Sequence, residues 1–187
     1  KAFRNEINPR FFTFRSREFV QMEMEYFCHD DEAMDWYDYW REQRWNFYRE
    51  RLGFAESALR ILDHEQLAHY AKACVDVEYL FPIGWSELEG IANRTDFDLK
   101  QHSSWSGKDL SYFDSATNER FIPYVIEPSA GADRSTLAFL VDAYTEEEVE
   151  GASRVVLKLH PALAPIKVAI LPLSKNERLV PLARDVH

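Results

Sequence analysis

The sequence lacks the features that mark several protein classes. It has only two cysteines, Cys28 and Cys74, among 187 residues, which excludes a disulfide framework and favours a reducing, cytoplasmic compartment. No apolar run is long enough to cross a bilayer, so we expect no membrane contact. Internal repeats and low-complexity tracts are absent as well. Hydrophobic residues nevertheless make up 46% of the chain, which predicts a folded core.

Basic residues are in deficit. The chain has 22 Lys and Arg against 32 Asp and Glu, a net charge of −10. Proteins that bind nucleic acids neutralise phosphates with a basic surface, so charge alone favours a small-molecule enzyme. The chain also starts at Lys1 with neither an initiator methionine nor a signal peptide, and we therefore expect a piece of a longer protein.

The most informative stretch is Phe3–Phe27, which predicts two strands joined by a polar loop. The first strand covers Phe3–Ile7 and ends before Pro9, because proline cannot donate to a strand ladder. The second covers Phe14–Phe27 and alternates with a period of two. One of its faces is apolar from Val20 onward, and we expect that face to pack on a core.

The opposite face of the second strand is polar, with basic residues at one end and acidic residues at the other. It comprises Arg15, Arg17, Phe19, Gln21, Glu23 and Glu25. Arg4 and Glu6 repeat the pairing on the first strand. A half-buried strand with a solvated face is the plain structural interpretation, but such a face needs no sorting of charge. The gradient suits a ligand with a phosphate end and an ammonium end, stacked on Phe19 between them.

These residues carry a family resemblance. FRNE, RSREF and QMEME, read in that order, resemble motif 2 of the class II aminoacyl-tRNA synthetases in the form of the homodimeric glycyl-tRNA synthetases. HYAKACVDVEY, FPIGW, ELEGIA and RTDFDL are similar to later segments of that family, and EPSAGADR resembles motif 3. The resemblance covers essentially the whole chain, without motif 1, which builds the class II dimer interface.

Hydrophobic periodicity predicts the remaining elements. We expect helices over Asp30–Arg51 and Glu56–Ala73, and a third helix that begins near Arg134. Further strands are expected over Val75–Tyr79, Trp85–Ala92 and Phe121–Glu127, and a loop or hairpin over Lys100–Asn118.

Two short sequences invite a zinc-site interpretation, and both fail. HEQLAH places His64 and His69 five residues apart, which turns them roughly 140° away from each other on a helix, whereas HExxH needs a spacing of four. Cys28 and His29 make too small a cluster for a structural zinc site.

Acidic residues at Thr145–Glu150, followed by Gly151, predict a domain boundary. The first domain would be residues 1–151, a class II catalytic core without motif 1. Residues 152–187 would be the truncated beginning of a second domain, because LHPALAPIKVAILPL resembles the opening of the family's α/β anticodon-binding domain. Val155–Leu159 and Ile166–Leu173 lack alternation, as parallel strands covered on both faces do.

The resemblance implies an α+β fold, in which an antiparallel sheet is flanked by helices and followed by the start of the α/β domain. It implies that a homodimeric parent enzyme activates glycine with ATP to glycyl-adenylate and transfers it to tRNA(Gly), with magnesium as cofactor. The alternative is a synthetase-like accessory or binding protein without aminoacylation activity. An acid-rich interaction domain built on the aromatic helix 30–51 is a third possibility, supported by composition alone.

Site residues follow from the same resemblance. Arg4 and Arg134 would be the catalytic residues: Arg4 would hold the α-phosphate, since a guanidinium grips two phosphate oxygens at once, and Arg134 would face the adenine from the side opposite Phe19. Glu87 would hold magnesium. Contacts to ATP would come from Arg4, Asn5, Glu6, Phe14, Arg15, Ser16, Arg17, Glu18, Phe19, Glu87, Leu88, Gly131, Ala132, Asp133 and Arg134. Contacts to glycine would come from Phe19, Gln21, Glu23, Glu127, Ser129 and Gly131.

Overall fold

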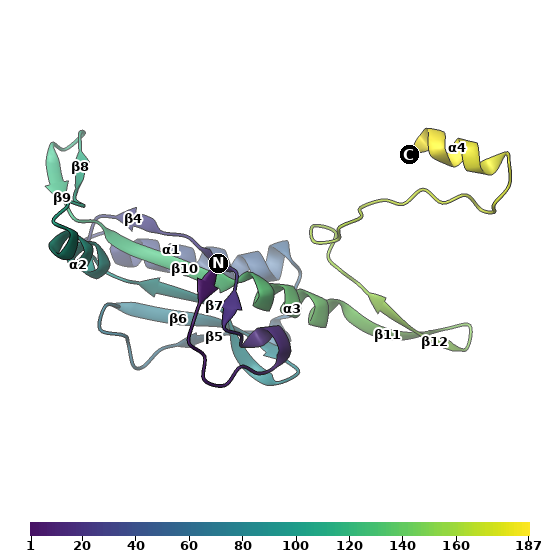
Figure 1. Ribbon diagram of the computed structural model, residues 1–187, viewed down its shortest axis with the longest axis horizontal. Coiled ribbons are helices and arrows are strands. Elements are labelled where there is room, and N and C mark those ends of the chain that lie inside the picture. The colour runs from purple at the N-terminus through teal and green to yellow at the C-terminus, as the bar shows by residue number, and fades with distance from the viewer.

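The computed structural model describes residues 1–187 as an elongated molecule built on one antiparallel sheet (Figure 1). The strand order is β3-β10-β7-β6-β5, and β4 pairs with the other end of β10. The bounds of these strands are β3 (Gln21–Glu23), β4 (Tyr26–Cys28), β5 (Leu59–Asp63), β6 (Ala73–Phe81), β7 (Gly84–Asn93) and β10 (Tyr124–Gly131). The α+β fold class predicted from the sequence is confirmed.

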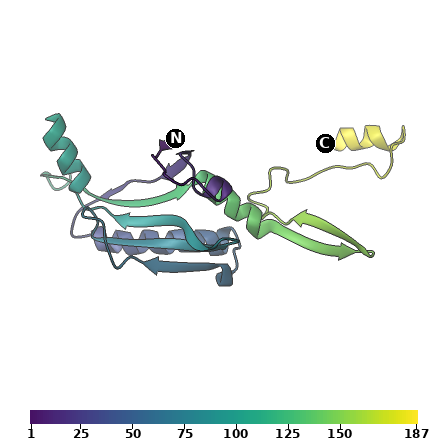
Figure 2. The same cartoon turned by 60° about the horizontal axis from the view of Figure 1, so that its bottom comes forward.

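Helix α1 (Ala33–Asn46) packs on β7 and β10 and continues as a π-helical turn over Phe47–Arg51. The helix predicted over Asp30–Arg51 is therefore confirmed. Figure 2 shows α1 running along the strands, while the N-terminal segment lies beside β10 and α3 (Ala132–Ala143). That segment comprises β1 (Ala2–Phe3), the 3-10 turn η1 (Phe12–Phe14) and β2 (Glu18–Phe19), with β1 paired to β2.

The core lies between α1, α3 and the sheet, and it contains one buried ion pair. Glu89 of β7 is 2% exposed. Its carboxylate accepts hydrogen bonds from Arg44 at 2.5 and 3.0 Å and from the Tyr48 hydroxyl at 2.6 Å. These contacts join the end of α1 to the sheet, because Arg44 and Tyr48 both project from the helix toward β7.

The strands predicted at Val75–Tyr79 and Trp85–Ala92 are confirmed, as β6 and β7. The helix predicted over Glu56–Ala73 is wrong. Only one 3-10 turn, η3 (Glu56–Ala58), forms there, and β5 then pairs antiparallel with β6. Leu59, opposite Tyr79, is buried in the core, so pairing with β6 overrides a helical pattern in this short segment.

Two further predictions are right in part. Phe121–Glu127 is split between β9 (Glu119–Phe121) and β10, with Pro123 between them. A hairpin of β8 (Tyr112–Asp114) and β9 begins within Lys100–Asn118, but the start of that segment, up to Ser106, belongs to α2 (Phe97–Ser106) instead of a loop.

The apolar face predicted for the second strand reaches the core at Tyr26, which packs against it, but it is exposed nearer the start of the strand. Val20 is 42% exposed and Met22 is 50% exposed. The strand is divided into β2, β3 and β4, and β3 lies at an edge of the sheet. Edge strands are covered on fewer sides, which leaves these side chains open.

The C-terminal region departs from the sheet. β11 (Tyr144–Val149) and β12 (Ala152–Leu157) form an antiparallel hairpin, so the parallel strand predicted at Val155–Leu159 is wrong. The turn at Glu150 and Gly151 has positive φ at both residues, as two-residue hairpins favour.

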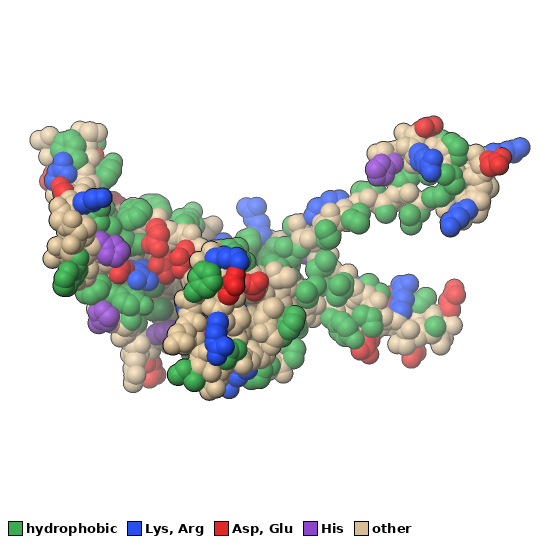
Figure 3. Space-filling view, viewed as in Figure 1, with side chains coloured by type: hydrophobic (Ala, Val, Ile, Leu, Met, Phe, Trp, Pro, Cys, Tyr) green, Lys and Arg blue, Asp and Glu red, His purple; other side chains and the backbone are tan.

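No strand forms at Ile166–Leu173, which contradicts that prediction too, and the chain ends in α4 (Leu179–Val186). Hydrophobic side chains lie open to solvent along the extended segment that precedes α4 (Figure 3). The division into domains at residue 151 remains a prediction. None of the helices is long and apolar enough to traverse a lipid bilayer.

Candidate active site

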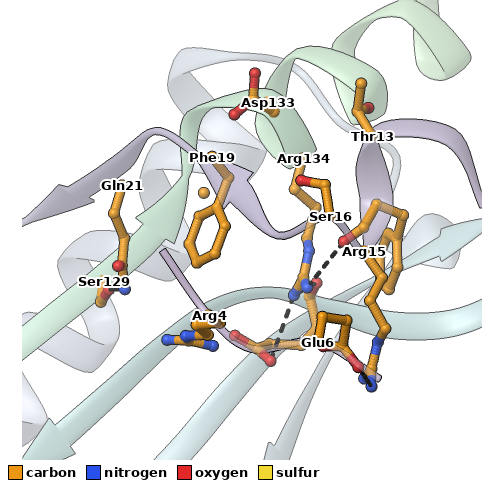
Figure 4. A pocket seen from close by; sticks show the side chains of 13 residues that line it. Arg4, Glu6, Thr13, Arg15, Ser16, Phe19, Gln21, Ser129, Asp133 and Arg134 are labelled. Carbon is orange, nitrogen blue, oxygen red and sulfur yellow. Dashed lines mark hydrogen bonds and ion pairs between the residues drawn. The ribbon is translucent and has the colours of Figure 1, made fainter. Parts of the chain in front are cut away.

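A cavity of about 150 Å³ opens where the N-terminal segment meets the junction of β10 and α3 (Figure 4). Its walls come from three parts of the chain that are distant in sequence. They are Arg4, Glu6, Thr13, Phe14, Arg15, Ser16, Phe19, Gln21, Glu87, Ser129, Gly131, Asp133 and Arg134. The lining is predominantly polar, which suits a charged ligand better than an apolar one.

Backbone hydrogen bonds fix the N-terminal segment over the sheet. The Arg4 N–H donates to the Arg17 carbonyl at 3.0 Å, next to the β1–β2 pair. The Val20 N–H donates to the Asp133 carboxylate at 2.9 Å, and the Ala132 N–H donates to the Val20 carbonyl at 2.8 Å. The start of α3 is therefore tied to the segment that carries the first cavity wall.

Arg134 projects from the first turn of α3 across the cavity floor. Its guanidinium donates to the Glu87 carbonyl at 2.9 Å and to the Phe14 carbonyl at 3.3 Å, and it lies 4.1 Å from the centre of the Phe14 ring. The Glu87 carboxylate is 3.4 Å away. A cation in the first turn opposes the helix dipole, and these acceptors offset that cost.

Arg4 lies on the other side of the cavity, with its guanidinium carbon 5.2 Å from the centre of the Phe19 ring. Close to it, the Glu6 carboxylate is 3.6 Å from an Arg15 nitrogen, and Arg17 donates to the Glu6 carbonyl at 3.0 Å. The Arg4 guanidinium thus lies over the Phe19 ring, so this side of the cavity offers a cation next to an aromatic ring (Figure 4).

A polar group continues from the cavity along β3 and β10. In the antiparallel register Ser129 is opposite Glu23, and Gly131 is opposite Gln21. The Gln21 amide donates to the Ser129 hydroxyl at 3.1 Å, and that hydroxyl is 3.5 Å from a Glu23 carboxylate oxygen. Carboxylate, hydroxyl and amide oxygens gathered in this way can accept hydrogen bonds from an ammonium group.

Glu127 lies further along the same face and is held by Arg94, whose nitrogen is 3.0 Å from the carboxylate. Arg94 also donates to Asp98 at 2.8 Å and stacks on the Tyr70 ring at 4.4 Å. Partial burial and the neighbouring Glu127 carboxylate raise the pKa of Glu25 to about 7. The two acidic side chains therefore share one environment beside a fixed arginine.

The structure brings most of the predicted site residues to the cavity. Seven of the predicted residues do not line it: Asn5, Arg17, Glu18, Glu23, Leu88, Glu127 and Ala132. Of these, Leu88 is a core residue, 1% exposed, and Glu18 pairs with Lys1. Glu23 is linked to the cavity through Ser129, as described above.

Sequence reasoning missed Thr13, which lines the cavity, and also Glu25 and Arg94, which lie near Glu127. Arg94 opens the RTDFDL segment, so the family resemblance carried a signal for it. Glu25 continues the polar alternation of Gln21 and Glu23, and that alternation was the signal available for it.

The cavity wall that carries Glu87 has the chemistry that a magnesium site needs. Glu87 offers a carboxylate at the cavity, half exposed and next to Arg134. Magnesium in nucleotide sites is bound by one or two carboxylates together with substrate phosphates and water, so a single protein carboxylate suffices as an anchor.

The fold is that of a class II aminoacyl-tRNA synthetase. Among solved structures, the crystal structure of seryl-tRNA synthetase from Pyrococcus horikoshii complexed with ATP matches with a TM-score of 0.62 and 16% sequence identity. The match covers 76% of this chain and 32% of that one. At this level of identity the match concerns the fold alone.

The chain is homologous to glycine–tRNA ligases, which confirms the resemblance drawn from its motifs. The enzyme of Clostridium tetani is 63% identical over 94% of this chain, that of Caldanaerobacter subterraneus subsp. tengcongensis 59% over 94%, and that of Clostridium kluyveri 58% over 100%. The chain spans only 38–40% of the length of these relatives. No protein-family model matches it.

Proposed function

We propose that this chain contributes the ATP and glycine sites of a glycine–tRNA ligase, which forms glycyl-adenylate and transfers glycine to tRNA(Gly). One observation carries the proposal. A single polar cavity joins Arg4 and Phe19 of the N-terminal segment to Arg134 of α3, and it continues into the acidic group at Glu23 and Ser129. One end suits a nucleotide and the other suits an ammonium group.

The nucleotide would lie between the two arginines. Arg4 would hold the α-phosphate through two parallel hydrogen bonds, and the Phe19 ring would stack on adenine. Arg134, fixed by the Glu87 and Phe14 carbonyls, would face the opposite side of the adenine. Glu6 would accept a hydrogen bond from the adenine amino group.

Glycine would lie at the acidic end. Its ammonium group offers three donors, and Glu23, Glu127 and the Ser129 hydroxyl supply three acceptors. Ser129 already contacts Glu23, and Glu127 is paired with Arg94. Larger amino acids would be rejected sterically, since overpacking a rigid site is costly.

The reaction would be an in-line displacement. A carboxylate oxygen of glycine attacks the α-phosphorus, the bond from that phosphorus to the bridging oxygen breaks, and pyrophosphate leaves with the electron pair. Such chemistry depends on positioning and on neutralising phosphate charge rather than on acid–base catalysis. Magnesium, anchored by Glu87, would supply part of that neutralisation. Two cysteines without a disulfide support a cytoplasmic setting, and the family resemblance supports a homodimer.

Pyrophosphate exchange in the full-length enzyme tests the proposal. Arg4→Ala removes a charge-assisted hydrogen bond worth about 1.5–3 kcal/mol, so the exchange rate should fall roughly 10- to 100-fold. Arg4→Lys should recover only part of it, because lysine cannot form the paired contact. Arg10→Ala is the matched control, since Arg10 stacks on Phe11 outside the cavity. Wild-type exchange in Arg4→Ala would overturn the assignment.

A further inference from the structure

A second cluster of ligand-type side chains lies on the sheet, on the strands furthest from β3. His64, Cys74 and Asp76 each offer one ligand atom, and the three atoms all lie within 4.8 Å of one another. The His64 Nε2 atom is 2.8 Å from an Asp76 carboxylate oxygen. His64 belongs to HEQLAH, and Cys74 and Asp76 lie in HYAKACVDVEY, but the proposed reaction uses none of the three.

Strand pairing brings the cluster together. The His64 N–H donates to the Cys74 carbonyl at 3.0 Å, so His64 continues the β5–β6 pairing and lies opposite Cys74. Asp76 follows Cys74 by two residues in β6 and therefore shares its face. The face is open beside them, because β7 presents only Gly90 opposite Asp76 and Ala92 opposite Cys74.

We propose that His64, Cys74 and Asp76 bind a divalent transition-metal ion, with Zn²⁺ as the expected occupant. Zinc accepts a thiolate, an imidazole and a carboxylate at 2.0–2.3 Å from the ion, so three such atoms in a tetrahedral site lie about 3–4 Å apart. The upper limit of 4.8 Å exceeds that spacing by about 1 Å, so side-chain rotation on binding would have to bring the atoms closer. His64 and Asp76 are partly exposed, which leaves room for water as a fourth ligand.

The ion would close the base of the loop over 65–72, which connects β5 to β6. That loop carries Tyr70, whose ring stacks on Arg94 and whose carbonyl accepts from the Thr95 hydroxyl at 3.1 Å. His69, the second histidine of HEQLAH, lies apart and packs on Phe97 at 4.9 Å. His64 would thus share the metal ion with Cys74 on the neighbouring strand. The spacing of histidines along one helix could not reveal that second ligand.

Cobalt substitution tests the site without any assay of activity. We would add Co²⁺ to the reduced, metal-free chain and record its absorption spectrum, because a thiolate ligand gives a near-ultraviolet charge-transfer band and tetrahedral geometry gives strong visible bands. One cobalt per chain should bind with both features. Cys74→Ser should lose the charge-transfer band, and His64→Ala should lose most of the visible intensity.

Cys28→Ser is the matched control, since Cys28 is the other free cysteine and lies outside the cluster. It should keep both spectral features, and circular dichroism would establish that each variant is folded. Zn²⁺ should displace Co²⁺ and raise the melting temperature of the wild-type chain but not of Cys74→Ser. A wild-type chain without a charge-transfer band, or a band that depends on Cys28, would overturn the proposal. Visible bands alone would place cobalt at His29, Asp30 and Asp31 instead, and would also overturn it.

Discussion

Residues 28–143 and residues 144–187 differ in how they bury side chains. All of the buried residues fall between Cys28 and Ala143. Beyond Ala143, Leu163 packs against the core, whereas Val168 and Leu173 are 79% and 95% exposed. Hydrophobic burial stabilises a fold in proportion to the apolar area removed from water, so the sheet region holds its own shape and the C-terminal region contributes little to it.

The same contrast applies to charged groups. In the sheet region Arg44 and Glu89 form a buried pair with Tyr48, and Arg94 and Glu127 form a partly buried one. In the hairpin of β11 and β12 the pair formed by Arg154 and Glu147 lies at the surface. The geometry of a buried ion pair matters for stability, because a buried charge that loses its partner cannot turn to water. The candidate cavity is lined in part by Glu87 and Ser129 of this sheet region.

The largest expected effect comes from breaking the buried pair. Glu89→Ala leaves Arg44 uncompensated and the Tyr48 hydroxyl without its acceptor, so we expect a loss of about 3–5 kcal/mol in the free energy of unfolding. Urea denaturation followed by circular dichroism measures it. Glu147→Ala in the hairpin should leave the midpoint unchanged, because its partners are exposed. Equal urea midpoints in the two variants would show that the buried pair of the sheet region stabilises the fold no more than the surface pair of the hairpin does.

An intermediate effect is expected at the acidic group that continues from the cavity along β3 and β10. Glu127→Gln and Glu23→Gln should each raise the glycine concentration needed for half-maximal pyrophosphate exchange by about 10-fold, because each loses a charge-assisted hydrogen bond to the ammonium group. The dependence on ATP should stay nearly the same. Glu148→Gln, in the exposed hairpin, is the control. A parallel loss of ATP affinity would show that the glycine pocket is misplaced.

The smallest expected effect concerns Glu25, whose pKa is raised from 4.5 to about 7 by partial burial and by the Glu127 carboxylate. The native state therefore holds this proton more tightly than the unfolded chain does. Ionising Glu25 costs stability, so its contribution declines as the pH rises from about 4.5 through 7 and then levels off.

Glu25→Gln should remove that decline. Urea midpoints of the variant and the wild type should agree near pH 4.5, and the variant should be the more stable near pH 8. Arg94 and Glu23 also face Glu25, and both are unchanged in this comparison. A difference between variant and wild type that is the same at both pH values would contradict the assignment of the proton to Glu25.

The motifs and the long helix were accessible to sequence reasoning because they depend on local spacing. Trp36 and Tyr37 lie within the confirmed α1, and the FRNE and EPSAGADR segments do meet at one cavity. Leu59 to Asp63 was assigned to a helix because its strand partner, β6, lies further along the chain and sets its conformation. The exposure of Met22 depends on the order of strands in the sheet, which alternation along one strand does not encode.

The hairpin of β11 and β12 is a second case in which strand pairing could not be predicted from the local sequence. Continuous apolar residues at Val155 and Val156 suggested a strand covered on both faces, but the positive φ values at Glu150 and Gly151 turn the chain straight back. Likewise Arg94 and Glu127 are 33 positions apart in the sequence, and only the pairing of β7 with β10 makes them neighbours.

Calorimetric titration of this chain with ATP tests most directly that its cavity, and no other region, binds the nucleotide. The wild-type chain should bind one ATP, and Arg134→Ala should bind it at least 10-fold more weakly, since it loses a charge-assisted contact worth about 1.5–3 kcal/mol. Arg154→Ala, which removes an arginine from the exposed hairpin, should bind ATP as the wild type does. If Arg134→Ala bound ATP as tightly as the wild type, or if the loss followed Arg154 instead, the nucleotide would not bind in this cavity.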